Sequence, residues 1–116
     1  MPNLDIIIVN WNSGFFISDC IESIMNSNHE DVKNIIIIDN DSIDNSLENL
    51  PSFNKVKIYK NKSNEGFAKA CNLGTKYCES DYILFLNPDT KVFENTISRA
   101  LEIIKQESEI GILGIS

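Results

Sequence analysis

Short apolar runs rich in β-branched residues alternate along this chain with longer stretches in which apolar residues recur every three or four positions. The short runs are typical of strands buried on both faces of a sheet, and the longer stretches are typical of amphipathic helices. Strands are predicted at residues 4–9, 35–38, 56–59, 82–86 and 110–115. Helices are predicted at residues 17–25, 42–50, 67–78 and 93–104.

Strands that alternate with helices imply a parallel sheet covered by helices on both faces. The pattern therefore predicts one Rossmann-like three-layer α/β/α domain over residues 1–116, with a mainly parallel sheet. A length of 116 residues and an apolar content of 42% fit one packed domain. The first strand is not followed by the G-x-G-x-x-G fingerprint, which argues against an NAD or FAD enzyme.

The chain is acidic, with 17 acidic and 10 basic residues and a formal net charge of −7. This balance disfavours a nucleic acid or an anionic membrane surface as the main partner, because both require basic patches. A small anionic ligand stays compatible with it, since a metal ion can bridge acidic residues to phosphates.

The three cysteines, Cys20, Cys71 and Cys78, show no C-x-x-C spacing and are interpreted as reduced thiols packed like small hydrophobes. His29 stands in a polar stretch and is interpreted as a solvated loop residue, not a zinc ligand. The start of the chain has no basic region followed by a long apolar segment, so neither a signal peptide nor a spanning helix is expected there. A cytoplasmic protein is expected, with a peripheral position at the inner face of the cell membrane left open.

Three polar clusters follow predicted strands: Asn10-Trp11-Asn12, Asp39-Asn40-Asp41 and Asn87-Pro88-Asp89. Taken singly, each is most simply an ordinary turn, because Asn and Asp are common turn residues. In an open parallel sheet, however, the carboxyl ends of the strands lie at one edge, where ligands bind. The three clusters are therefore predicted to meet in one crevice.

This crevice suits a substrate that carries a diphosphate. Breaking a sugar–phosphate bond leaves negative charge on the departing diphosphate, and a divalent cation held by one or two carboxylates neutralises it. Asp89 directly follows an apolar strand, and Pro88 stiffens the turn before it. Asp89 is therefore the expected ligand of Mn²⁺ or Mg²⁺.

With these residues, the chain resembles the amino-terminal half of a family 2 glycosyltransferase of the GT-A fold. The pairing of Asn-Trp-Asn with Leu-Asn-Pro-Asp-Thr is similar to the rhamnosyltransferase-like branch, which builds bacterial surface polysaccharides. The matching segments are residues 6–12, 38–42, 64–68 with Asn72 and Gly74, and 85–90.

The resemblance implies a role for each position. Asn87-Pro88-Asp89 matches the D-x-D metal motif, with Asn87 in place of the first aspartate. Asp39 and Asn40 match the pair that recognises base and ribose, and an amide at position 40 can pair with a pyrimidine ring. The predicted nucleotide-binding residues are Val9, Asn10, Asn12, Asp39, Asn40, Asn64, Gly66 and Asn87.

The resemblance also implies a UDP- or dTDP-sugar donor and a saccharide or lipid-linked acceptor. Family members are longer, and their catalytic base and acceptor pocket come from a second half, so no residue here matches the base. A final strand without its usual neighbours is expected to be poorly paired. Either disorder of the 110–115 segment or a homodimer through it is therefore expected.

Other functions stay open at this stage. A nucleotidyltransferase normally has a glycine-rich basic loop after the first strand, whereas the loop here has no basic residue. A receiver-type signalling domain needs an acidic pair at that position, which is Asn10-Trp11-Asn12 here. A non-catalytic nucleotide-binding module is the third alternative, and only an assay of activity distinguishes it from an enzyme.

Overall fold

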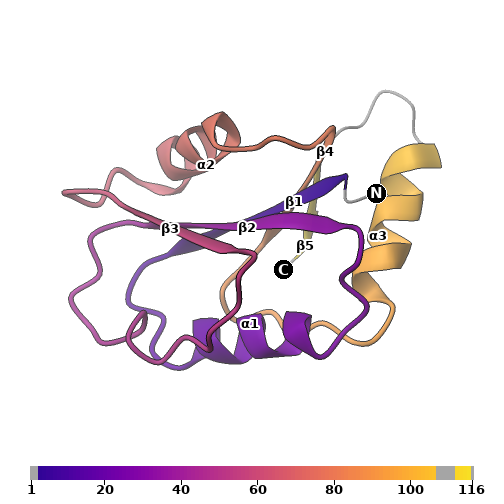
Figure 1. Cartoon of the computed structure of the whole chain (residues 1–116). Helices are drawn as coiled ribbons and strands as arrows, with labels where there is room; N and C mark the ends of the chain where they lie inside the picture. Colours follow the sequence, from indigo (N-terminus) through magenta and orange to yellow (C-terminus); the bar gives the residue numbers. More distant parts are fainter. Residues whose placement is uncertain (1–2, 107–111, 116) are drawn as a thin grey trace.

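The structure is a computed structural model that describes residues 3–106 and the backbone of residues 112–115. Three helices and five strands alternate in it, apart from the direct passage from the second strand to the third (Figure 1). The strands are β1 (Leu4–Asn10), β2 (Val32–Asp39), β3 (Val56–Lys60), β4 (Tyr82–Leu86) and β5 (Ile112–Ile115). The helices are α1 (Phe16–Met25), α2 (Phe67–Lys76) and α3 (Thr96–Gln106).

All four strand pairs are parallel, and the strand order is β3-β2-β1-β4-β5. Helix α2 lies on one face of the sheet, and α1 and α3 lie on the other (Figure 1). The three predicted layers and the parallel sheet are confirmed. Within the described residues, no helix is long and apolar enough to cross a bilayer.

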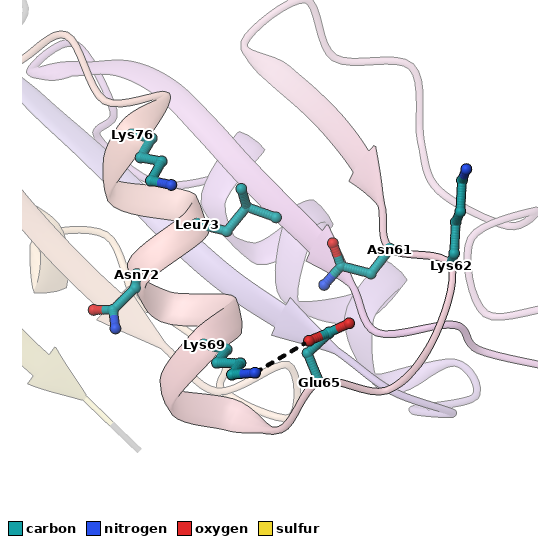
Figure 2. A pocket seen from close by; sticks show the side chains of 7 residues that line it. All are labelled: Asn61, Lys62, Glu65, Lys69, Asn72, Leu73 and Lys76. Atoms are coloured by element: carbon teal, nitrogen blue, oxygen red, sulfur yellow. Dashed lines mark ion pairs between the residues drawn. The ribbon is translucent and has the colours of Figure 1, made fainter.

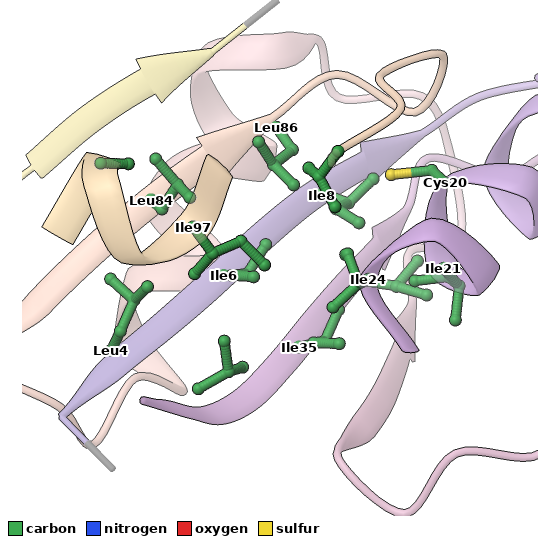
Figure 3. Close-up of a cluster of buried hydrophobic side chains, with 14 of the residues drawn as sticks. Leu4, Ile6, Ile8, Cys20, Ile21, Ile24, Ile35, Leu84, Leu86 and Ile97 are labelled. Atoms are coloured by element: carbon green, nitrogen blue, oxygen red, sulfur yellow. The ribbon is translucent and has the colours of Figure 1, made fainter. Parts of the chain in front are cut away.

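The sheet is buried on both faces because successive side chains of a strand point to opposite sides. Ile6 and Ile8 of β1 pack into the larger core with α1 and α3, where Ile24 and Ile97 contribute (Figure 3). Ile7 lies between them in sequence and packs on the opposite face of the sheet, which α2 covers. This arrangement explains why the strand sequences read as continuous apolar runs.

The predicted helix at residues 42–50 is wrong, because the chain forms turns there. Side chains accept hydrogen bonds from backbone N–H groups of this segment and hold it in turns. The Asn12 carboxamide oxygen accepts from the N–H of Ile43 (2.8 Å), and the Asp44 carboxylate accepts from the N–H of Ser46 (3.1 Å). Short polar side chains thus compete with the helix for its donors.

The last predicted helix begins later than expected, at Thr96, and Phe93 is left 78% exposed in the preceding loop. The N–H of Phe93 donates to the Thr96 hydroxyl oxygen at 2.9 Å, which holds the loop against the helix start. Phe93 therefore contributes to the surface instead of the apolar stripe of α3.

Strand β5 pairs with β4 in regular register over residues 112–115, so the expected poor pairing is wrong for this segment. Ile110 and the side chains of the segment lie outside the described residues. β5 forms one edge of the sheet, and an edge strand can recruit another chain. Self-association through residues 110–115 stays a prediction.

We expect light scattering across a dilution series to give a mass above that of one chain at high concentration. The double variant Ile112→Lys, Leu113→Lys should reduce this association, because charges on an edge strand oppose pairing. A mass that stays at one chain throughout the series would contradict the prediction.

Candidate functional site at the carboxyl edge of the sheet

The three polar clusters lie at one edge of the sheet, as the parallel order requires. Asn10 ends β1 and is the register partner of Asp39, which ends β2. Asn87 directly follows β4, the neighbour of β1 on its other side. The strand order changes direction between β1 and β4, and such a switch point is where open α/β sheets bind ligands.

Asn10 is fully buried and connects the first two loops of this edge. Its amide nitrogen lies within hydrogen-bond distance of a carboxylate oxygen of Asp39 (2.8 Å) and of the hydroxyl oxygens of Ser46 (3.0 Å) and Ser42 (3.2 Å). Its amide oxygen accepts a hydrogen bond from the Ser13 hydroxyl. With both ends of the amide engaged, Asn10 holds the loops in place and has no free group for a ligand.

Asp39 is likewise buried and is bound by the loop that follows it. One carboxylate oxygen accepts from the Ser42 hydroxyl (2.7 Å), and the other accepts from the Ser42 N–H (3.1 Å). Beside it, a cavity of about 330 Å³ is lined by Asp39, Asp41, Ser42 and other residues of this loop. The carboxylate therefore borders a cavity while most of its hydrogen-bonding capacity serves the loop.

Asn40 joins β2 to the segments that follow β3. Its amide oxygen accepts from the Asn61 side chain (2.9 Å), and its amide nitrogen donates to the carbonyl of Gly66 (3.2 Å). The side chain is 2% exposed. Direct pairing of Asn40 with a pyrimidine is therefore not supported, because both groups that would pair with the base are occupied and buried.

Asn12 locks the β1–α1 loop onto the β2–β3 loop. It adopts a positive φ of 49°, and its N–H donates to the Ser42 hydroxyl at 2.9 Å. Asp44 in turn accepts from the N–H of Gly14 (2.9 Å).

The half-buried Val9 lies on the face of the sheet that α2 covers, and Trp11 is exposed at the edge. Of the first two polar clusters, Trp11 and Asp41 are the exposed members.

Asn64 and Gly66 form the entry to α2. The N–H of Gly66 donates to the Asn64 side-chain oxygen at 2.8 Å, and both residues are exposed. Gly66 has a φ of 87°, a value that side chains disfavour, although a Cβ there would meet no atom within 4 Å. The glycine is therefore required by the backbone, and the helix entry stays exposed to solvent at the edge.

The third cluster presents an exposed carboxylate directly after β4. The N–H of Thr90 donates to the carbonyl of Asn87 (3.0 Å) and closes the turn. Asp89 is exposed, and Asn87 is half-buried. Thr90 is 9% exposed, and its hydroxyl is one of two buried side-chain oxygens without a hydrogen-bond partner in the described part of the chain. A buried polar atom of this kind needs an explanation, and an absent ligand is one.

A sequence model of the family described as "Glycosyl transferase family 2" matches residues 5–115, which is nearly the whole chain. The chain belongs to glycosyl transferase family 2. Two curated proteins are similar to this chain over most of its length. The minor teichoic acid biosynthesis protein GgaB of Bacillus subtilis is 32% identical over 97% of this chain. The teichoic acid poly(glycerol phosphate) polymerase of Staphylococcus epidermidis is 30% identical over 88% of it.

This family 2 chain spans only 13% and 15% of those two relatives. Among solved structures, residues 1–349 of TarS from S. aureus, in complex with UDP-GlcNAc, superimpose with a TM-score of 0.75. That match covers 91% of this chain and 32% of the TarS chain at 20% identity. At this identity the likeness shows the fold, the GT-A arrangement.

The residues of this family 2 domain that could hold a divalent cation are few. Among the described residues, no three His, Cys, Asp or Glu side chains group as a metal site. Mg²⁺ and Mn²⁺ are nevertheless commonly held by one or two carboxylates, while substrate phosphates fill other positions. An exposed Asp89 beside the unpartnered hydroxyl of Thr90 fits that kind of incomplete site.

The cysteines and His29 lie outside this arrangement. Burial raises the pKa of the Cys20 thiol to about 12, and the negative charge of Asp89 adds to the shift. Cys20 is thus a protonated, packed thiol.

His29 is half-buried against Phe53, with its ring nitrogen 2.9 Å from the Lys55 amine. His29 lies in a loop, as expected, but its contact with Phe53 leaves the ring only partly exposed to solvent.

Four residues that matter here were not among the predicted site residues: Ser42, Ser46, Asn61 and Thr90. Ser42 and Ser46 surround the buried amide of Asn10, and Asn61 binds Asn40. A signal for Ser42 was present in the sequence, because a serine three residues after an aspartate is a common turn arrangement. No local pattern indicates Asn61 or Ser46, because their partners are 21 and 36 residues away.

Proposed function

We propose that this chain is the nucleotide-sugar-binding part of a glycosyltransferase that uses a UDP- or dTDP-sugar donor. The observation that carries the proposal is the exposed Asp89 carboxylate at the switch point between β1 and β4, next to the unpartnered Thr90 hydroxyl. Membership of the family supports transfer of a sugar, and the UDP-GlcNAc complex of TarS supports a uridine nucleotide. The family match argues against the receiver-type and nucleotidyltransferase alternatives.

The acceptor belongs to the same proposal. The names of both relatives concern teichoic acid, and the second names poly(glycerol phosphate), a phosphate-containing polymer. These names favour a saccharide or polymer acceptor of that class, in a protein that continues the fold with an acceptor-binding half. The catalytic base is expected in that half, and no residue of this chain is assigned to it.

Under this proposal, each predicted site residue has either a binding role or a supporting role. Asp89 would hold Mn²⁺ or Mg²⁺, which neutralises charge on the departing diphosphate. Asn87 would contribute a neutral oxygen, and the Thr90 hydroxyl would donate a hydrogen bond to a phosphate oxygen. Val9, Asn64 and Gly66 would line the nucleoside side. Asn10, Asn12, Asp39 and Asn40 would keep both walls of the site rigid, which reduces the ordering cost of binding.

Calorimetry with UDP, dTDP, GDP and ADP, with and without Mn²⁺, tests the proposal. We expect binding of UDP or dTDP that depends on the metal and weaker binding of the purine nucleotides. Equal binding of all four nucleotides would remove the pyrimidine assignment. Binding that does not respond to Mn²⁺ would remove the metal from the site.

The Thr90→Val variant separates a ligand-binding hydroxyl from a structural one. Because this buried hydroxyl has no partner in the described structure, its replacement by a methyl group should leave the free energy of unfolding unchanged or raise it by about 1–3 kcal/mol, the cost of an unpaired buried polar group. Binding of UDP with Mn²⁺ should weaken by roughly 10- to 150-fold, because a hydrogen bond to a charged group is worth about 1.5–3 kcal/mol.

The Thr96→Val variant is the matched control for Thr90→Val. Its hydroxyl accepts from the Phe93 N–H, so its loss should cost about 1 kcal/mol of stability and leave nucleotide binding unchanged. Urea denaturation and calorimetry give the two quantities for both variants. If Thr90→Val lost stability and kept its affinity, the hydroxyl would be structural and its role in binding would be wrong.

A further inference from the structure

A second cavity, of about 470 Å³, lies between the end of β3 and the outer side of α2. Figure 2 shows Lys69, Asn72, Leu73 and Lys76 on the helix, with Asn61 and Lys62 on the opposite wall. The four helix positions are spaced i, i+3, i+4 and i+7 and therefore form one stripe of α2. The volume falls in the range of about 300–1,000 Å³ that small-ligand sites occupy.

The lining of this cavity opposes the charge of the rest of the chain. Three of the ten basic residues line it, together with a single acidic residue, although the chain has a net charge of −7. That acid, Glu65, lies 3.6 Å from the amine of Lys69, so it offsets one cation. Within the described residues, Lys62 and Lys76 form no ion pair. Two lysines without an ion pair thus line one hollow.

A solvated helix face with one i,i+4 ion pair is the plain alternative. Such a face is convex and carries mixed charges. Here the stripe borders a hollow, its charge is positive at both ends, and Leu73 provides apolar surface between Lys69 and Lys76. An apolar floor with a few convergent polar groups is the usual make-up of a binding site.

The diphosphate of a donor held at Asp89 does not reach this cavity. Asp89 follows β4, and three strand spacings separate β4 from β3 in the sheet, or about 14 Å. The phosphates of one nucleotide sugar lie together, so an anion beside Lys62 and Lys76 would belong to a second molecule.

The cavity is nevertheless connected to the nucleotide side. Asn61 lines it and donates its side-chain hydrogen bond to Asn40, which in turn donates to the carbonyl of Gly66. These bonds fix the position of the cavity relative to the entry of α2. A ligand here would therefore lie at a set place beside the donor.

We propose that this cavity, formed around Lys62, Lys69 and Lys76, binds a phosphate group of the acceptor, whose chemical class is then a chain of phosphodiesters such as poly(glycerol phosphate). This inference rests on the proposed function and adds the acceptor's anchoring point. The acceptor chain lies along the β3 side of the sheet and extends toward the nucleotide side, while its phosphate is held by ammonium groups that the donor does not use.

The test compares two double variants with the same change of charge. Lys62→Gln with Lys76→Gln removes the two unpaired cations of the cavity. Lys33→Gln with Lys105→Gln is the control. Lys33 is the second residue of β2, and the amine of Lys105 lies 5.9 Å from the centre of the Tyr82 ring at the start of β4. Both lysines are therefore at the opposite end of the sheet. Lys76 and Lys105 each stand in the last turn of a helix, so the control also matches the loss of a helix-end cation.

The probes are a short synthetic poly(glycerol phosphate) oligomer, an oligonucleotide with the same number of phosphates, and UDP with Mn²⁺. We expect the cavity variant to bind the oligomer roughly five- to tenfold more weakly than the parent, since two exposed ion pairs are lost. The control pair should bind it as the parent does, and all three proteins should bind UDP equally. Addition of the oligomer should shift backbone amide resonances of residues 61–76.

Any one of three outcomes would overturn the proposal. The first is that the parent fails to bind the oligomer at all. The two double variants could lose the same affinity, or the oligonucleotide could bind as tightly with the same dependence on Lys62 and Lys76. Loss of UDP binding in the cavity variant would mean that this cavity is part of the donor site, which would also overturn the proposal. A parent that binds the oligomer but no nucleotide would instead contradict the proposed function, so the two failures are distinguishable.

Discussion

The Asp89→Asn variant should lose metal-dependent binding of UDP by at least about 100-fold, the upper end of the losses seen when residues around a metal's ligands are changed. Asp89 is exposed at the end of a buried strand, and the other described acids do not group with it into a metal site. Its replacement therefore removes the charge that a cation needs at the switch point. Because the side chain is exposed, the free energy of unfolding should stay within about 0.5 kcal/mol of the parent.

Two variants give this result its meaning. Asp41→Asn makes the same chemical change at the same edge of the sheet, at a position whose φ of 61° asparagine tolerates, and it should leave UDP binding unchanged. Asn87→Ala should weaken binding less than Asp89→Asn, because an amide brings no charge to the cation. Calorimetry with and without Mn²⁺ measures all three. Undiminished metal-dependent binding by Asp89→Asn would show that the metal motif is misplaced.

The layers of the fold followed from sequence because the main strands are buried on both faces. The seven isoleucines and two valines that fill most of β1 and β2 leave no other reading of these segments. The segment at 42–50 could not be read in the same way. Its apolar spacing suits a helix, but Asn12 and Asp44 capture its backbone donors, and Asn12 is more than 30 residues away. Tertiary hydrogen bonds decided its structure.

The position of the three polar clusters was predictable, but the contacts of each residue were not. Strand ends mark where Asn10, Asp39 and Asn87 lie, because parallel strands bring them to one edge. Whether a side chain faces a ligand or the protein depends on partners distant in sequence. Asn40 illustrates this, since an exposed amide at that position would suit a pyrimidine, whereas Asn61 and Gly66 occupy it here.

The other large effect is expected at the opposite edge of the sheet, where Asp5 is fully buried in β1. One carboxylate oxygen accepts from the N–H of Asn34 (3.0 Å). The other accepts from the N–H groups of Glu79 (2.6 Å) and Ser80 (2.9 Å) in the turn before β4. This carboxylate joins β1, β2 and the approach to β4, three neighbours in the sheet, by satisfying donors that would otherwise be buried without partners.

The Asp5→Asn variant should therefore be destabilised by roughly 2–4 kcal/mol, out of about 5–15 kcal/mol for a typical domain. Asparagine has the same shape, but in either orientation its NH₂ faces backbone N–H groups and leaves at least one without an acceptor. Urea denaturation measures the loss. Asp81→Asn makes the same change at an exposed position of the same turn and should stay within about 0.5 kcal/mol of the parent.

Nucleotide binding separates this structural role from a functional one. Asp5 and the end of β1 are about 16 Å apart along the strand, at the usual rise per residue. Folded Asp5→Asn should therefore bind UDP with Mn²⁺ as the parent does, at a temperature where both proteins are fully folded. A variant as stable as the parent would mean that the three N–H groups find water or other acceptors. The carboxylate would then not be what holds the amino edge of the sheet together.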